Sequence, residues 1–280
     1  MKQIRLGTCL SFLLALVGLM EAIPAAPAQE SASLPPPAEK AEKWDDARKK
    51  IEKLHATVTV NGAVQPLTIG EKPVLSFSDP IREINTGTVW LIGLEGRPQA
   101  ILSLFFNDAE NSWSYELTSL STQQVMVEKQ RRWKWNTKKS GLTVDRLSHK
   151  TTPAGSPTVR MTQMKAIARD FTAMENYQGS RIELRLLSQP LLRYADEKQG
   201  IVDGALFAFA HSTDPEVLLV IESIKGNDGT AGWRYGAARL STAELHLLYQ
   251  QAEVWTVDAV ETFVVSDPYY SLQERPFPGQ

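Results

Sequence analysis

Acidic residues in the C-terminal half of the chain are the side chains best suited to catalysis. Two carboxyl groups about 5 Å or about 7–9 Å apart can hydrolyse a glycosidic bond, one as general acid and the other as nucleophile or base. Such a pair would make the protein a carbohydrate-active hydrolase. The candidates, with one arginine and one tyrosine close to them in sequence, are Asp196, Asp203, Asp214, Glu216, Glu222, Arg193 and Tyr194.

Other observations argue against an enzyme. Asp196 aligns with Asp79 when the two halves of the chain are compared, and an aspartate kept in both halves is more simply explained as a turn residue that accepts backbone amides. The sequence contains no Gly-x-Ser-x-Gly elbow, phosphate-binding loop, dinucleotide glycine motif or His-Glu-x-x-His motif. We therefore assign no catalytic residue and expect a non-enzymatic protein, with the hydrolase as the alternative.

A basic run interleaved with tryptophan is the candidate binding surface. Arg131, Arg132 and Trp133 could hold an anionic glycan or single-stranded nucleic acid. Trp133 aligns with Glu253, so the fold does not require a tryptophan there. A formal net charge of −2 disfavours nucleic acid, because phosphate binding needs a concentrated basic field. The sequence favours a glycan or an envelope protein as partner, and the competing interpretation is a solvated strand face.

Metal-binding patterns are absent from the sequence. The four histidines stand far apart, with no second ligand at metal-binding spacing, and the one cysteine, Cys9, falls within the N-terminal leader. We therefore predict no metal and no cofactor. The histidines are His55, His149, His211 and His246.

The N-terminus has the pattern of an export signal. Lys2 and Arg5 precede an apolar run from Leu6 to Met20, and Ala26-Pro27-Ala28 offers small residues at a cleavage site. The run is shorter than the roughly 20 residues that a membrane span needs. Residues 1–28 are therefore predicted to be a signal peptide, followed by a disordered linker over 29–40. This predicts a secreted or periplasmic protein with no membrane span after cleavage.

An internal repeat organises the rest of the chain. Leu67–Ser103 aligns without gaps with Leu184–Val220, and after a three-residue length change Ser112–Trp135 aligns with Gly232–Trp255. Two tryptophans stand at the same separation in both copies, and duplicated large aromatic residues favour core positions. The aligned aromatic pairs are Trp113/Trp233, Tyr115/Tyr235 and Trp135/Trp255.

Periodicity within the copies indicates short antiparallel strands. We predict a mainly β fold with minor α structure, in which the duplicated unit forms a two-sheet sandwich or flattened barrel plus two helices. Ser121 to Gln124 and Ser241 to Glu244 resemble helix starts, whereas nearby valines favour strands. The predicted segments are an amphipathic helix over 41–56, copy 1 over 57–136, a loop and connecting helix over 137–181, copy 2 over 182–266, and a loose tail over 267–280.

The second half also resembles a group of exported bacterial proteins without an established function. The resemblance rests on RMTQMKAIARDF from Arg160, ELRLLSQPLLRY from Glu183, and DGALFAFAHSTDPEV from Asp203. It implies export and brings no activity or site residue. From the residues themselves, we expect an exported binding or structural module of the cell envelope.

Overall fold

The computed structural model describes residues 38–130, 132–226 and 229–275. All of them belong to one of the two units into which the chain divides, residues 37–280. The predicted signal peptide and the linker as far as residue 37 lie outside the described residues. Among the described residues, no helix is both long and apolar enough to cross a membrane.

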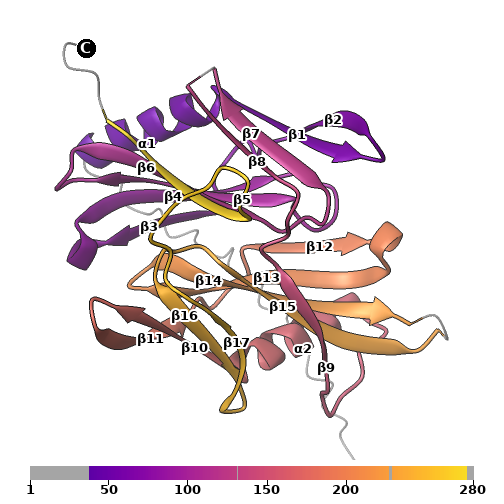
Figure 1. Cartoon of the computed structure of the whole chain (residues 1–280). Coiled ribbons are helices and arrows are strands. Elements are labelled where there is room, and N and C mark those ends of the chain that lie inside the picture. The colour runs from indigo at the N-terminus through magenta and orange to yellow at the C-terminus, as the bar shows by residue number, and fades with distance from the viewer. Residues whose placement is uncertain (1–37, 131, 227–228, 276–280) are drawn as a thin grey trace, which may run out of the picture. The chain divides into compact units, whose positions relative to one another are not determined.

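The strands confirm the duplicated β fold, and the order of elements is the same in both copies (Figure 1). The first copy contains α1 (Ala38–Ile51), β1 (Leu54–Val60), β2 (Ala63–Leu67), β3 (Leu75–Asp79), the 3₁₀ helix η1 (Pro80–Arg82), β4 (Ile84–Ile92), β5 (Ala100–Asn107), β6 (Ser112–Ser119), β7 (Gln124–Lys129) and β8 (Trp133–Thr137). After β9 (Thr143–Leu147), the second copy contains α2 (Pro157–Arg169), β10 (Phe171–Tyr177), β11 (Ser180–Leu186), β12 (Leu192–Asp196), η2 (Glu197–Gln199), β13 (Ile201–His211), β14 (Asp214–Lys225), β15 (Ala231–Arg239), β16 (Glu244–Tyr249) and β17 (Ala252–Val257). The last strand is β18 (Tyr269–Glu274).

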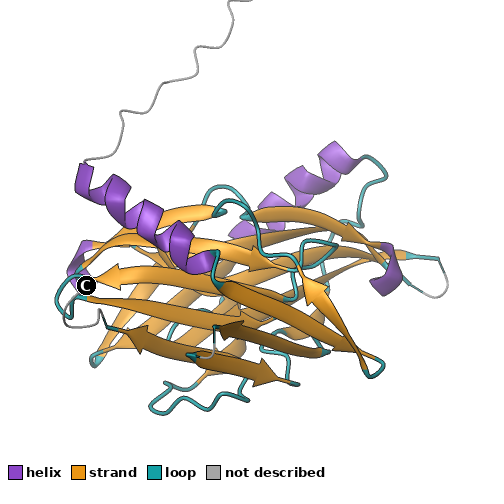
Figure 2. Cartoon of the chain, turned by 90° about the horizontal axis from the view of Figure 1, so that it is seen from above, coloured by secondary structure: helices purple, strands orange, loops and turns teal. Residues whose placement is uncertain are grey.

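Strand pairing repeats in detail between the copies. The order β2-β1-β7-β8 corresponds to β11-β10-β16-β17, and β3-β4-β5-β6 corresponds to β12-β13-β14-β15. Helix α1 lies against β4 and β5, and α2 lies against the equivalent strands β13 and β14. Figure 2 shows both long helices on the same side of the strands. The hairpin turns also match, with positive φ at Asn61-Gly62 and at the aligned Gln178-Gly179.

The copies exchange their outermost strands. Strand β9 follows the first copy in sequence but pairs with β15 of the second, whereas β18 follows the second copy and pairs with β6 of the first. Figure 1 shows the yellow β18 beside the first copy and the magenta β9 beside the orange β15. The expectation of a loose tail over 267–280 is therefore wrong for Tyr269–Glu274. Prolines 268, 276 and 278 flank this segment without interrupting it.

Three apolar clusters hold these sheets. One lies within each copy, and the third lies between the copies. The duplicated aromatics occupy matching places, since Trp113 and Trp135 lie in the first copy's core and Trp233 and Trp255 in the second's. The cluster between the copies is built largely from aligned pairs, for example Ile84/Ile201, Ile101/Leu218 and Leu120/Leu240. Each copy thus buries its own core, and it also buries one apolar face of the other copy.

Of the two alternatives left open after Ser121 and Ser241, the strand is the one that forms, as β7 and β16. Each serine hydroxyl accepts a backbone amide two residues on, from Gln123 at 3.0 Å and from Ala243 at 3.2 Å. The serines therefore close turns, and the buried valines of β7 determine the strand.

Several predicted boundaries also shift. The first helix ends at Ile51, because Leu54 belongs to the alternating buried positions of β1 and does not extend the helical stripe. Phe171 and Met174 fall within the segment 137–181, predicted as a loop and a helix, but they lie on β10. The segment 137–181 contains β9 in addition to a loop and a helix, and the last strand of the second copy ends at Val257.

One repeated contact explains why both copies keep a glycine in the fourth strand. A Cβ atom on Gly87 would lie 2.2 Å from the ring of Phe77, and one on Gly204 would lie 2.7 Å from the ring of Tyr194. These two rings occupy aligned positions on β3 and β12 and pack into the cluster between the copies.

Gly87→Ala is expected to lower the free energy of unfolding by about 2 kcal/mol, because the Phe77 ring must move within a packed core. Gly155→Ala is the control, since nothing lies within 4 Å of that position. Urea denaturation measures both. Equal midpoints for the two variants would contradict the proposed ring contact.

Candidate functional site: a carboxyl cleft between the copies

A cavity of about 500 Å³ opens between the copies at the start of β14. Residues from β6 and η1 of the first copy and from β14 of the second line it. We call it the carboxyl cleft and define it by Arg82, Glu116, Asp214 and Glu216. Asp214 and Glu216 stand two residues apart at the start of β14, and both line this cavity. Phe105, Tyr177 and Phe263 contribute aromatic surface.

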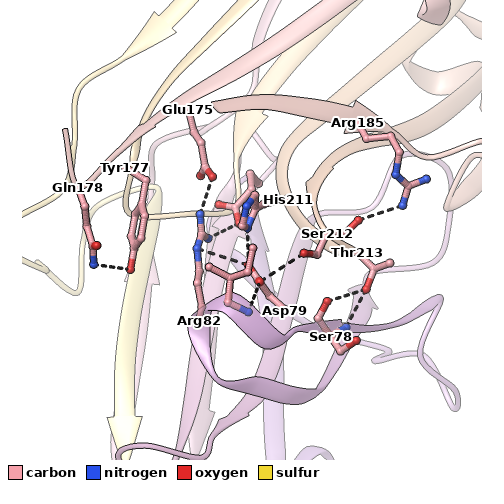
Figure 3. A network of polar contacts seen from close by, with 12 residues as sticks. Ser78, Asp79, Arg82, Glu175, Tyr177, Gln178, Arg185, His211, Ser212 and Thr213 are labelled. Carbon is pink, nitrogen blue, oxygen red and sulfur yellow. Dashed lines mark hydrogen bonds and ion pairs between the residues drawn. The ribbon is translucent and has the colours of Figure 1, made fainter. Parts of the chain in front are cut away.

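Arg82 is held at the cleft by carboxylates from both copies (Figure 3). Its guanidinium donates to Glu216 Oε1 at 2.5 Å and to Glu175 Oε1 at 2.6 Å, and its Nε lies 3.5 Å from Asp79 Oδ2. Burial opposes the positive charge, but Glu216 and Glu175 outweigh it and raise the pKa of Arg82. The ring of Tyr177 lies 4.4 Å from the guanidinium carbon.

Asp79, the third carboxylate beside Arg82, also has partners of its own. Its carboxylate accepts the backbone amide of Ile81 at 3.1 Å, which caps η1, and lies 2.5 Å from His211 Nδ1. Asp196 repeats the capping role by accepting the amide of Gln199 at 3.2 Å. The interpretation of both aspartates as turn residues is therefore confirmed. Asp196 also accepts the side-chain amide of Gln199 at 2.8 Å, whereas Asp79 has an arginine and a histidine as further partners.

The other carboxyl groups of the cleft have few hydrogen-bond donors, among the described residues, to offset their burial. Glu116 accepts the Tyr269 hydroxyl at 2.8 Å. Asp214, which is 5 % exposed, has no side-chain hydrogen bond or ion pair among the described residues. Glu216 Oε2 is also buried without a hydrogen-bond partner there.

Burial makes ionisation of these groups costly. It raises the pKa of Glu116 to about 7, against lowering by the Tyr269 hydrogen bond and two arginines. It raises the pKa of Glu216 to about 8, although Arg82 acts in the opposite direction. The pKa of Asp214 lies well above its usual range because of burial and of Glu216 and Glu116 beside it. Burial therefore favours the protonated forms of all three cleft acids.

The duplication provides an internal comparison. A second cavity, of about 1080 Å³, occupies the equivalent place on the other side of the interface. There Arg97 aligns with Asp214, Gln99 with Glu216, and Gln199 with Arg82. Buried Val58 aligns with Glu175. The fold therefore does not require these charges, and they distinguish one cavity from its counterpart.

The remaining candidate carboxylates lie elsewhere. Glu222 binds Arg97 at 2.8 Å and the Tyr194 hydroxyl at 2.7 Å, and it also pairs with Arg234. Asp203 pairs with Arg160 at 2.9 Å and with Arg193 at 2.7 Å, which lowers its pKa although burial opposes this. Only Asp214 and Glu216 of the predicted set come together in the cleft.

The predicted glycan-binding run lies on the first copy, and neither Arg132 nor Trp133 lines the cleft. Trp133 is half-buried, with its ring centroid 5.3 Å from that of Tyr115 and its indole nitrogen buried without a hydrogen-bond partner among the described residues. Arg132 donates to Glu274 at 2.8 Å. Arg131 lies outside the described residues, and binding at this run stays a prediction.

The histidines occupy separate places. His55 lies on β1, His149 accepts the amide of Thr151, His211 contacts Asp79, and His246 lies between Glu244 and Glu253. Within the described ranges, no group of three or more histidine, cysteine, aspartate or glutamate residues is arranged to hold a metal ion.

Sequence reasoning missed Arg82, Glu116 and Glu175. The usable signal was a difference between the copies, because Arg82 aligns with Gln199 inside a segment that otherwise matches. Glu175 stands at the position of Val58 on the equivalent strands β10 and β1, an equivalence that the strand order shows. Residues that are identical at aligned positions of the two copies are those that the fold requires. A buried position that is charged in one copy and uncharged in the other indicates a role that only one copy has.

Comparison with known proteins adds no further constraint. No protein-family model matches the chain, and no curated protein or solved structure matches it either.

Proposed function

We propose that the protein is an exported, non-enzymatic binding module of the cell envelope, and that its ligand occupies the carboxyl cleft. The observation that carries this proposal is the difference between the two equivalent cavities. One cavity is lined by Asp214 and Glu216 around Arg82, whereas its counterpart has Arg97, Gln99 and Gln199 at the aligned positions. A buried polar group without a partner is costly, so its retention supports a functional role.

The size and lining of the cleft suit a small molecule. Its volume of about 500 Å³ falls within the range of about 300–1,000 Å³ that ligand pockets occupy. Aromatic side chains provide contact area, and a few converging polar groups provide orientation. Export rests on the N-terminal pattern, and a glycan remains one candidate ligand.

Aligned threonines allow a matched test. Thr242 lines the cleft and Thr122 lines the equivalent cavity. We expect Thr242→Trp to fill the cleft and weaken ligand binding about tenfold or more, whereas Thr122→Trp leaves it within about twofold. Isothermal titration calorimetry with sugars, amino sugars, amines and short peptides measures the dissociation constant. Equal effects of the two substitutions on every ligand found would exclude the cleft.

Glycoside hydrolysis is the second candidate. It is favoured by one observation, the raised pKa of Asp214 beside Glu216, because a carboxyl kept neutral at pH 7 can act as a general acid. Release of reducing sugar from oligosaccharides, abolished by Asp214→Asn, would support it. Binding without release would favour the binding module.

A further inference from the structure

We propose that the ligand of the carboxyl cleft carries a cationic head group, an alkylammonium or guanidinium, which binds Asp214. This inference rests on the proposed function and names the class of ligand that the cleft selects.

Acidic groups outnumber the available cations at this place. Arg82 is engaged with Glu216, Glu175 and Asp79, and His211 contacts Asp79. The remaining cation, Arg239, donates from its guanidinium to the backbone carbonyls of Ser241 and Asp258 and lies over the ring of Tyr269. Asp214 and Glu116 are therefore left without a cation of their own among the described residues.

Asp214 is the group that a ligand would satisfy. It is more than nine-tenths buried, it lines the cleft, and none of the described residues gives it a hydrogen bond. Burying such a carboxyl unpaired is costly, and an incoming cation removes the cost by direct pairing. An anionic ligand would find no unengaged cation among the described residues that line the cleft.

In the equivalent cavity, a cation stands where the carboxyl cleft has an unpaired acid, and that cation is paired. Arg97 stands at the position of Asp214 and pairs with Glu222 at 2.8 Å, while Phe105 stands at the position of Glu222. In the carboxyl cleft the charged pair is thus replaced by an acid and an aromatic ring. A carboxylate beside an aromatic face is a suitable site for an organic cation, which gains both an ion pair and a cation–π contact.

Binding should be linked to proton release. The charged groups that act on Asp214 are Glu216 on β14, Glu116 from β6, Arg82 from η1 and Asp79 beside it. Glu175 from β10, His211 from β13, Arg239 from β15 and Tyr269 from β18 act on those groups in turn. The cleft acids have raised pKa values, so a cation that stabilises the carboxylate must expel a proton near neutral pH. Affinity should therefore increase as the pH rises from about 6 to about 8.

Matched probes test the charge requirement. Calorimetry would compare cadaverine with 1,5-pentanediol, glucosamine with glucose, and agmatine alone, at about pH 7.5. Two buffers with different ionisation enthalpies, neither a primary amine, report the protons released. We expect at least one cationic probe to bind about tenfold more tightly than its neutral partner and to release close to one proton. Asp214→Asn and Thr242→Trp should each weaken that binding about tenfold, and Thr122→Trp should not.

Other outcomes separate this inference from the proposed function. If neutral probes bind as tightly as cations and Thr242→Trp removes the binding, the cleft is a binding site but the cationic ligand is wrong. If amines bind without sensitivity to Thr242→Trp, they bind elsewhere and the inference fails. If no probe binds with a dissociation constant below about 10 mM, the inference fails, while glycan or peptide binding that responds to Thr242→Trp would still support the binding module.

Discussion

Raising the pH from about 5 to about 8 is expected to destabilise the ligand-free protein by on the order of 3 kcal/mol. Burial raises the pKa of Glu216 from 4.5 to about 8 and that of Glu116 from 4.5 to about 7. Between the unfolded and folded values, the native state holds protons that the unfolded state has released. Stability is therefore full below about pH 4.5 and is lost as the pH rises through the folded pKa values.

Urea unfolding at about pH 5, 6.5 and 8 measures this slope. Glu216→Gln replaces the acid with a neutral group of the same shape, so it should flatten the slope while the protein stays folded at pH 8. Glu274, whose pKa is about 2 because hydrogen bonds from Lys129 and Tyr115 outweigh burial, acts only below this window. Burial lowers the pKa of Lys129. Its titration therefore makes the folded state more stable as the pH rises, and this contribution falls at more alkaline pH than that of the cleft acids. A midpoint that rises steadily from pH 5 to pH 8 would contradict buried, protonated cleft acids.

A cationic ligand should oppose the loss of stability that the ligand-free protein shows as the pH rises. In its presence the ionised cleft is the stabilised form, so the gain in unfolding free energy from the ligand should grow as the pH rises. A neutral ligand would give a gain that does not follow the titration of Glu216. The same pH series with and without cadaverine therefore connects the stability of the protein to the identity of its ligand.

The repeat could be predicted because the fold makes the same physical demands on both copies. Trp113 and Trp233 fill equivalent cores, and Asp79 and Asp196 each accept an amide at the start of a 3₁₀ helix. Gly87 and Gly204 each leave room for an aromatic ring. Such requirements do not depend on function, so they remain visible when the halves are aligned.

The exchanged strands could not be predicted in the same way. Four of the five residues of β9 are exposed, so its alternation is weak, and its partner β15 lies in the other copy. β18 is surrounded by prolines that suggest a tail. Both strands form because they complete a sheet edge, and a sheet edge is a property of the tertiary structure.

The candidate site could not be found by searching the sequence for catalytic motifs either. Its residues come from segments far apart in the sequence, with Arg82 and Glu116 in one copy and Asp214 in the other. No local spacing relates them. Only the sheet stacking that the repeat implies brings them together, and the choice among acids then depends on burial.

Ending the chain after Pro268 is expected to have the largest effect on stability. It removes β18, and with it the pairing of Tyr269–Glu274 with Trp113–Thr118 on β6. Lys129, whose side chain is 4 % exposed, loses the carboxylate of Glu274, and Glu116 loses the Tyr269 hydroxyl. An uncompensated buried charge alone costs about 3–5 kcal/mol. Since a typical domain has about 5–15 kcal/mol of stability, the shortened protein should be largely unfolded at 25 °C.

Complementation provides the control for this truncation. A synthetic peptide spanning residues 269–275, added in excess, should restore the sheet edge and with it the near-ultraviolet circular dichroism of the tryptophans. The same peptide with Glu274 replaced by Gln should restore less, because Lys129 then has only a neutral partner. A shortened protein that unfolds at the urea concentration of the full chain would show that β18 adds nothing to the first copy.

Strand exchange also predicts how the whole described unit unfolds. Each copy's sheet is completed by a strand that is covalently attached to the other copy, and the third apolar cluster lies between the copies. Neither copy can therefore retain its full sheet after the other has unfolded. We expect a single cooperative transition, recorded at the same urea concentration by tryptophan fluorescence and by far-ultraviolet circular dichroism. Two separated transitions would mean that the copies fold independently, and the stabilising role of the exchanged strands would then be wrong.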